Sequence, residues 1–388
     1  MKRVFHFLLA STLLLYIASS DIYACTTFCL KSNGEMLFGK NYDWMIGDGM
    51  VFVNKRGVSK FSSEETNPAR WVSKYGSVTF NQYGWESPSG GMNEQGLVIE
   101  LMWLDDTQYP KVEDRPAVDV LEWIQYNLDT AATTDDVLHN AEMVRIDSDV
   151  KLHYLISDRN GKAATIEFLE GKLATHTGNH LPYSVLTNDP YARSLEYTKS
   201  AGAADSESSL DRFSRAASRS KAFEMRMHSE KEAVDFAFDL LGDVAQKNST
   251  QWSIVYDQRR GRIYFRTRKK PELKSIDTTV LDYSCGSSVK ILDIDHKASG
   301  DVTKDFKNYS RQANRDLIER SFGGTGFLKN VPTESKERFA EFPERFVCAA
   351  NSPVTRPLDP RSLVASGQFI GYLFPAFPLY HVLTVLAF

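Results

Sequence analysis

Apolar and polar residues alternate over much of the first half of the chain, and short turns interrupt the alternation. Two β-prone runs near the beginning flank Asn33-Gly34, a dipeptide typical of two-residue hairpin turns. Such a turn pairs residues whose numbers sum to 67, so Cys25 should face Tyr42. The pattern therefore predicts that the segment GKNYDW, residues 39–44, returns to the start of the first strand.

Further hairpins and three helices are predicted downstream. Strands beside Gly- or Asn-containing turns are expected at 97–101, 152–157, 163–168, 251–256 and 262–267. Apolar residues at helical spacing predict one helix that begins at Pro116, one that begins at Thr134 and one over 231–241. Blocks of hairpins separated by helices favour an α+β fold with antiparallel sheets over a doubly wound parallel fold.

The first 24 residues have the layout of a secretory signal peptide. Lys2 and Arg3 precede an apolar run over 4–17, and Ala24 occupies the position before a cleavage site. The apolar run is short for a helix that spans a bilayer. We therefore expect residues 1–24 to be removed on export to the periplasm or the cell exterior.

Cleavage after Ala24 would leave Cys25 with a free α-amine next to its thiol. Because an α-amine has a pKa of roughly 7.7–8.0, it can act as the general base for its own side chain. Two other interpretations of Cys25 stay open. It could be an ordinary cysteine that follows a signal peptide, or the lipid-modified cysteine of a bacterial lipoprotein, whose amine would be blocked.

The composition argues against several classes of protein. The 388 residues are 42% hydrophobic and 25% charged, which is typical of a globular protein, and a net charge of −4 gives no support for a nucleic-acid partner. Four cysteines are too few for a disulfide scaffold or a clustered zinc site, and we expect no metal or cofactor. Apart from Cys25, the cysteines allow one disulfide and one free thiol. The basic run over 259–270 is interpreted as the solvated face of a strand.

The C-terminal part of the chain is interpreted as an extension of uncertain structure over 336–388. It is apolar from about 363 and has no charged residue after Arg361. A membrane span, a packed extension and a tail created by a reading-frame shift all fit this composition, so membrane contact is expected only if the tail inserts. The residues between the two ends, 25–335, are predicted to form the functional domain.

Five short motifs follow one another along the predicted domain: CTT, GKNYDW, GMNEQGL, VLTNDP and DRFSRA. In this order, and with a cleavage site before Cys25, they resemble the choloylglycine hydrolase family of N-terminal nucleophile hydrolases, which contains bile salt hydrolases and penicillin V acylases. The resemblance extends over about 25–320. It implies a four-layer αββα sandwich of two antiparallel sheets and hydrolysis of a linear amide C–N bond.

The resemblance also implies a role for each motif residue. Cys25 would be the nucleophile, forming an acyl-thioester, and Asp43 would hold its α-amine. The side chain of Asn188 and the backbone N–H of Trp103 would form the oxyanion hole. Arg212 would help to hold the catalytic network together.

Three residues are expected to bind substrate. Lys40 replaces the arginine usual in the family, so it keeps the charge but loses the planar fork; an exposed structural lysine is the alternative. Trp44 and Trp103 would offer apolar surface to an acyl group, and burial in the core is the alternative for Trp44. Bile salt hydrolases tend to carry Asn, and penicillin V acylases Tyr, at the position of Trp103, so this residue fits neither subgroup.

The resulting hypothesis is an exported cysteine amidase whose partner is a small-molecule acyl amide. A conjugated bile acid, penicillin V and an N-acyl amino acid or lactone are the candidate substrates. An acyltransferase of the same fold, or a lipid-anchored binding protein with Cys25 blocked, is the alternative. A homo-oligomer is left open.

Overall fold

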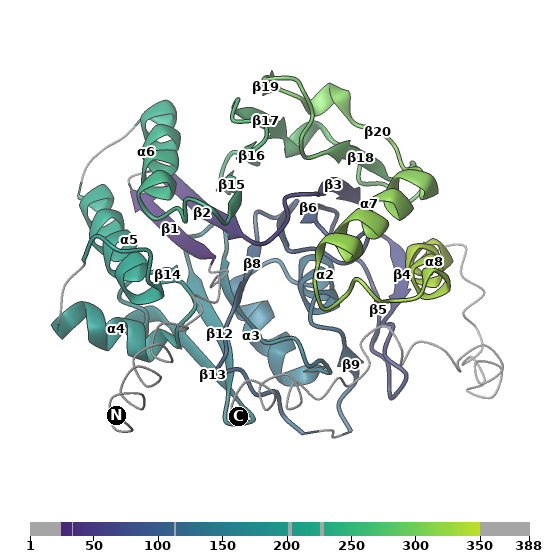
Figure 1. Cartoon of the computed structure of the whole chain (residues 1–388), viewed down its shortest axis with the longest axis horizontal. Coiled ribbons are helices and arrows are strands. Elements are labelled where there is room, and N and C mark those ends of the chain that lie inside the picture. The colour runs from purple at the N-terminus through teal and green to yellow at the C-terminus, as the bar shows by residue number, and fades with distance from the viewer. Residues whose placement is uncertain (1–24, 33, 112–113, 201–203, 226–228, 350–388) are drawn as a thin grey trace, which may run out of the picture.

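A computed structural model describes residues 25–349 except 33, 112–113, 201–203 and 226–228. Two large sheets pack face to face, and helices cover their outer surfaces (Figure 1). This is the predicted α+β sandwich. The predictions for the signal peptide, residues 1–24, and for the apolar tail beyond 363 lie outside the described residues.

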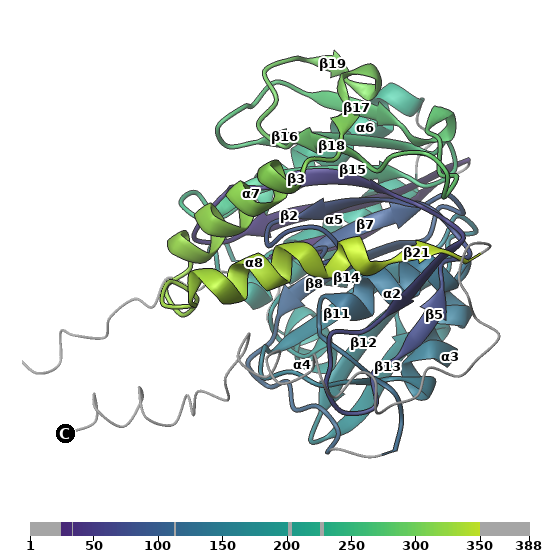
Figure 2. The ribbon, with the colours of Figure 1, turned by 90° about the vertical axis from the view of Figure 1, so that its right-hand side faces the viewer.

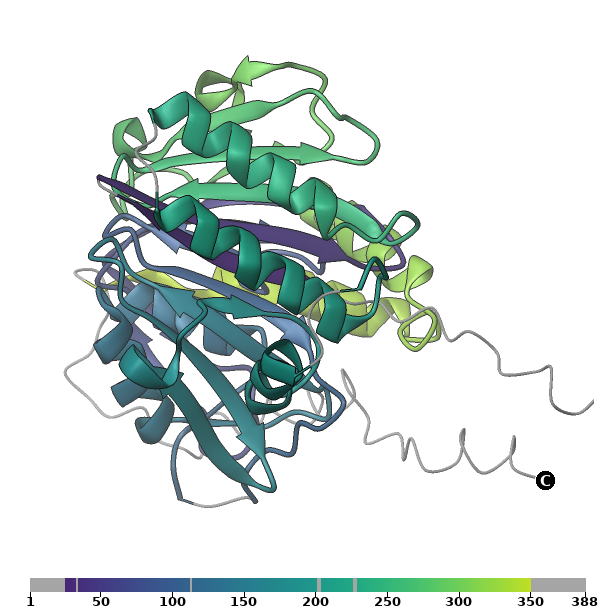
Figure 3. The ribbon, with the colours of Figure 1, turned by 90° about the vertical axis from the view of Figure 1, so that its left-hand side faces the viewer.

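The first sheet has seven strands and carries the start of the described chain. Its order is β14 (Val185–Leu186), β1 (Thr26–Ser32), β2 (Glu35–Asp43), β15 (Thr250–Asp257), β16 (Arg262–Thr267), β17 (Lys274–Asp277) and β19 (Gly300–Asp301). Helices α4 (Tyr191–Ser200), α5 (Ser209–Glu224) and α6 (Glu230–Asp243) belong to this side of the molecule. Figure 3 shows α5 and α6 lying across the purple strands β1 and β2.

The second sheet has nine strands. Its order is β13 (Lys172–Thr177), β12 (Ala163–Leu169), β11 (Leu152–Ser157), β8 (Val98–Trp103), β7 (Gly90–Asn93), β6 (Ser77–Asn81), β3 (Met50–Asn54), β18 (Lys290–Asp293) and β20 (Lys307–Asn308). Helices α2 (Glu122–Thr130) and α3 (Thr134–Met143) pack against it.

Smaller elements complete the described chain. They are the strands β21 (Val347–Cys348), β4 (Val58–Phe61) and β5 (Arg70–Val72), the parallel pair β9 (Ala117–Val118) and β10 (Arg145–Ile146), the helices α7 (Arg311–Gly324) and α8 (Thr333–Glu341), and the 3-10 turns Gly178–His180, Thr278–Val280, Thr303–Asp305 and Phe342–Arg345. Figure 2 shows α8 running beside α7 and leading into β21.

The N-terminal hairpin has the predicted register. Thr27 of β1 faces Lys40 of β2, and Gly34 in the turn takes a φ of 94°, which favours glycine. Every residue of β2 is buried, because β15 pairs with its other edge. The hairpin thus places the end of β2 beside the first described residue. The predicted hairpins downstream, including the solvated basic face of β16, are also confirmed.

Two predicted boundaries are wrong. Pro116 does not open a helix, since Ala117–Val118 forms a parallel pair with Arg145–Ile146 and α2 begins at Glu122. The boundary drawn after residue 335 falls inside α8, whose residues pack on α7. The spacing of apolar residues could not predict where these two helices begin or end, because both boundaries depend on contacts with distant segments.

One disulfide ties the end of the described chain to its body. Cys285 and Cys348 are bonded, and Cys29 is a buried free thiol. The bond closes a segment with a sequence separation of 63 residues. The double substitution Cys285→Ser/Cys348→Ser should therefore lower the free energy of unfolding by about 2–4 kcal/mol. Urea unfolding of the oxidised protein measures this loss, and an unchanged midpoint would contradict it.

None of the helices in the described ranges has the length and apolar character needed to cross a membrane.

Candidate active site

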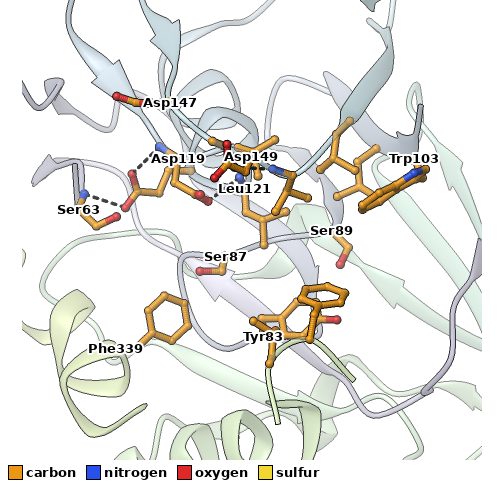
Figure 4. A pocket seen from close by; sticks show the side chains of 18 of the residues that line it. Ser63, Tyr83, Ser87, Ser89, Trp103, Asp119, Leu121, Asp147, Asp149 and Phe339 are labelled. Atoms are coloured by element: carbon orange, nitrogen blue, oxygen red, sulfur yellow. Dashed lines mark hydrogen bonds between the residues drawn. The ribbon is translucent and has the colours of Figure 1, made fainter. Parts of the chain in front are cut away.

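A cavity of about 530 Å³ extends from the N-terminal hairpin to the helices near the C-terminus. Cys25 and Asp43 line it together with aromatic residues of the C-terminal segment, which include Phe322 and Phe339. Figure 4 shows Trp103 and Ser89 on one side of the cavity and Ser63 and Asp147 on the other. The cavity thus connects the predicted nucleophile with a space large enough for a small molecule.

Cys25 lies at the wall of this cavity with only 4% of its surface exposed. Its Sγ lies 3.8 Å from the backbone oxygen of Asp43. Burial raises the pKa of the Cys25 thiol, while the positive charge of Lys40 opposes this rise. A base is therefore needed to take the thiol proton at neutral pH.

Asp43 ends β2 and is completely buried beside Cys25. A bulge in β15 places Thr250 opposite Asp43, and the Thr250 hydroxyl donates to Oδ1. The other carboxylate oxygen, Oδ2, has no hydrogen-bond partner within the described part of the chain. Burial raises the pKa of Asp43 to about 6, and the charge of Arg212 opposes the rise.

Arg212 connects the start of the chain to Asn188. It lies in the first turn of α5 and is fully buried. Its Nη1 donates to the backbone oxygen of Cys25 at 2.9 Å and to Thr26 Oγ1, and its Nη2 donates to Asn188 Oδ1 at 3.0 Å. The guanidinium fork therefore fixes both groups at once.

The side-chain amide of Asn188 has a defined orientation. Since Oδ1 accepts from Arg212, Nδ2 faces the other way and donates to the backbone oxygen of Trp103 at 2.8 Å. The backbone N–H of Asn188 donates to Ser209 Oγ at 2.9 Å. The structure thus brings together Cys25, Asp43, Asn188 and Arg212 from separate parts of the sequence.

Lys40 does not occupy the predicted position. It is fully buried, its Nζ lies 3.6 Å from Glu100 Oε2 and donates to the Leu101 carbonyl, and it is not among the residues that line the cavity. The predicted contact of Lys40 with substrate is therefore wrong, and so is the alternative that Lys40 is an exposed structural lysine. Gly90 opposite Glu100 makes room for this pair, because a Cβ there would lie 2.1 Å from the Glu100 Cδ.

The two predicted tryptophans do line the cavity. The rings of Trp44 and Trp103 have centroids 6.3 Å apart, and Trp44 Nε1 donates to the Tyr83 hydroxyl at 2.8 Å. Neither ring is fully buried, so each presents apolar surface to the cavity. This region can accept an apolar group near Cys25.

The far wall of the cavity is acidic, which sequence reasoning missed. It holds the side chains of Glu64, Asp119, Glu122, Asp147 and Asp149. Burial raises the pKa of Glu64 to about 9 and that of Asp119 to about 7, and neighbouring carboxylates add to both rises. These residues lie on three segments far apart in the chain, so only the fold reveals that they share a wall.

The acidic wall predicts a pH effect on substrate affinity. As pH rises from 6 to 9, Asp119 and then Glu64 lose protons, and the cavity becomes more negative. The KM of an anionic amide should rise about fivefold over this range, which corresponds to about 1 kcal/mol of repulsion. The KM of its uncharged carboxamide analogue should stay level after correction for Cys25 titration. Equal behaviour of the two substrates would contradict the prediction.

Within the residues described, no group of three or more His, Cys, Asp or Glu side chains is arranged to hold a metal ion.

Sequence comparisons with known proteins also point to an amide hydrolase. The family model "Linear amide C-N hydrolases, choloylglycine hydrolase family" matches residues 25–201. A penicillin V acylase of Pectobacterium atrosepticum is 27% identical over 334 residues, covering 72% of this chain and 88% of the relative. A bile salt hydrolase/transferase of Clostridium perfringens is 29% identical over 182 residues, covering 43% of this chain and 54% of the relative.

Solved structures agree in fold. The penicillin V acylase from Agrobacterium tumefaciens superposes with a TM-score of 0.67 at 28% identity, covering 74% of this chain and 98% of its own. A conjugated bile acid hydrolase from Clostridium perfringens, at 19% identity and a TM-score of 0.59, shares the fold over 71% of this chain and 98% of its own. Residues 25–201 are therefore similar to the choloylglycine hydrolase family, and these similarities support an amidase that acts on linear amide C–N bonds.

Proposed function

We propose that this amidase uses Cys25 as an N-terminal nucleophile after residues 1–24 are removed during export. The observation that carries the proposal is the unpaired Oδ2 of Asp43, buried beside Cys25 at the wall of the cavity. A buried carboxylate oxygen without a partner is costly. An α-amine created on Cys25 would supply a donor to this oxygen and a base for the thiol.

The proposed reaction has two steps, acylation of Cys25 and hydrolysis of the resulting thioester. The α-amine of Cys25 takes the thiol proton, and the thiolate attacks the amide carbonyl carbon. The tetrahedral intermediate collapses, the C–N bond breaks, and the α-ammonium returns the proton to the leaving nitrogen. Water, deprotonated by the α-amine, then attacks the thioester carbon and releases the carboxylic acid and the Cys25 thiol.

Asn188 is the proposed oxyanion donor. One N–H of its amide donates to the Trp103 carbonyl, and the amide has a second N–H to offer to the intermediate. The backbone N–H of Trp103 is the proposed second donor. Arg212 supports this arrangement through Asn188 Oδ1 and the Cys25 carbonyl.

Substitution of Asn188 by alanine tests this assignment. Loss of one oxyanion donor should lower kcat by about 10²–10³-fold while KM changes little. Asp189→Ala is the matched control, because Asp189 is the next residue and forms a surface ion pair with Arg193. A kcat for Asn188→Ala within a factor of about three of the control would remove Asn188 from the mechanism.

The proposed substrate is an amide whose acyl part is bulky and apolar. Trp44 and Trp103 support this assignment, since they line the cavity that reaches Cys25. Relatives named for penicillin V and bile salts support the choice of phenoxyacetyl and steroid acyl amides as candidates. N-acyl amino acids and lactones complete the candidate set.

A substrate panel with mass detection of the enzyme tests the proposal. Penicillin V, glycine- and taurine-conjugated bile acids, N-acyl amino acids and an N-acyl lactone are each mixed with the protein, and the reaction is quenched in acid. The proposal predicts release of the amine and a transient acyl adduct on the Cys25 peptide. Turnover with an adduct on another residue would contradict it.

Acyl transfer is the second candidate activity. One relative is named a bile salt hydrolase/transferase, and an acyl-thioester on Cys25 could be intercepted by an amine instead of water. Including a primary amine in the panel distinguishes the two, because a transferase forms a new amide at the expense of free acid.

A further inference from the structure

A buried histidine–glutamate pair lies next to Asn188, and the proposed mechanism does not use it. His153 of β11 and Glu167 of β12 are both fully buried, and His153 Nδ1 lies 3.3 Å from Glu167 Oε1. The backbone N–H of Tyr191, at the start of α4, donates to the same oxygen at 3.0 Å. The pair therefore joins the nine-stranded sheet to the chain segment that carries Asn188.

The other nitrogen of His153 reaches the peptide bond that precedes Asn188. Nε2 lies 2.8 Å from the carbonyl oxygen of Thr187. The N–H of the same peptide bond, which belongs to Asn188, donates to Ser209 Oγ at 2.9 Å. This peptide unit is thus held at its oxygen by His153 and at its nitrogen by Ser209.

The proton positions on His153 follow from its partners. The Thr187 carbonyl can only accept, so Nε2 must carry a hydrogen. Burial alone would raise the pKa of Glu167, but the contact with His153, the proximity of His176 and the hydrogen bond from the Tyr191 N–H outweigh burial and lower this pKa to about 2. The ionised carboxylate of Glu167 also only accepts hydrogen bonds, and it faces Nδ1 of His153.

We propose that His153, oriented by Glu167, is a positioning residue that holds the Thr187–Asn188 peptide so that the Asn188 amide points at the oxyanion. The inference rests on the proposed role of Asn188. Arg212 and Trp103 fix the far end of the Asn188 side chain, while His153 and Ser209 fix its backbone. A small misplacement of a group in an active site can lower the rate by about 10²-fold.

Two isosteric substitutions at His153 separate its two contacts. In His153→Gln the amide nitrogen occupies roughly the place of Nε2 and keeps a donor to Thr187. In His153→Asn the shorter amide occupies roughly the place of Nδ1 and keeps only the donor to Glu167. The proposal predicts that kcat falls about 10–100-fold in His153→Asn and stays within about threefold in His153→Gln, with KM little changed in both.

His176→Phe is the matched control. His176 Nδ1 lies 3.4 Å from the other oxygen of Glu167 and 3.0 Å from Thr165 Oγ1, and neither contact involves Thr187. Phenylalanine preserves the ring packing against Tyr191, where the centroids are 4.7 Å apart. This variant removes the side-chain contacts of His176 with Glu167 and Thr165 and leaves the contact of His153 with Thr187 in place, so its kcat should resemble that of the parent protein. Thermal unfolding of all three variants shows whether folding differs.

A double-mutant cycle with Asn188→Ala completes the test on the full-length chain, assayed with whichever amide of the panel it hydrolyses. His153→Asn should cost nothing further once Asn188 is alanine, because both changes remove the same stabilisation. Equal loss of kcat in His153→Asn and His153→Gln, or additive losses in the double variant, would overturn the proposal. If Asn188→Ala itself leaves kcat unchanged, the oxyanion role fails and the positioning role fails with it.

Discussion

Replacing Cys25 with alanine should abolish amide hydrolysis. Removal of the nucleophile from a comparable covalent mechanism lowers kcat by about 10⁵–10⁶-fold, which is below detection in an ordinary assay. Because Cys25 is already almost completely buried, the substitution should have little effect on the surface of the protein. The measurement is the rate of amine release from the best substrate of the panel.

Cys29→Ala is the matched control for this experiment. Cys29 lies four residues further along the chain, in β1, and is also a buried free thiol, but it is not among the residues that line the cavity. Its substitution should leave kcat within about threefold, in line with a packing role. Retention of activity in Cys25→Ala, or its loss in Cys29→Ala, would place the nucleophile elsewhere.

The second large effect is expected for Asp43→Asn. Asparagine keeps the shape of the side chain but cannot offer a charged acceptor at Oδ2, so it can no longer hold the α-ammonium that forms on Cys25. A comparable loss of an orienting carboxylate lowers kcat by about 10⁴-fold. We expect a fall of about 10³–10⁴-fold in kcat for the processed protein.

Thr250→Val separates this effect from simple damage to the Asp43 environment. It removes the donor to Oδ1 and leaves Oδ2 as it is. A single hydrogen bond to a charged group contributes about 1.5–3 kcal/mol, and part of this loss should appear as a fall in kcat of about tenfold or less. Near-equal losses in the two variants would show that Oδ2 has no special role. N-terminal sequencing of Asp43→Asn separates a catalytic defect from failed processing.

Local sequence signals predicted the part of the site that lies on one hairpin. The dipeptide Asn33-Gly34 predicts the register that β1 and β2 adopt, so the approach of Asp43 to Cys25 could be expected from the residue numbers alone. The positions of Asn188 and Arg212 could be assigned only through the family resemblance. The hydrogen bonds that orient them join the segment after β14 to α5 and β8, which are far apart in the sequence.

Features set by packing between distant segments were not predictable from the sequence. The amine of Lys40 is buried against Glu100 and the Leu101 carbonyl of β8, a strand of the facing sheet. The acidic wall near Asp119 and the contact of His153 with Thr187 likewise need the assembled fold. The residues that form these features have local sequence patterns typical of ordinary strands and turns. Export and oligomeric state stay predictions.

The most direct test of the central claim is the N-terminus of the active protein. The full-length chain is expressed in an exporting bacterium, purified in its active form and analysed by intact mass and N-terminal sequencing. The account predicts a chain that begins at Cys25 with a free α-amine. An active protein that still carries residues before Cys25, or whose Cys25 amine is acylated, would contradict the proposed nucleophile and its built-in base.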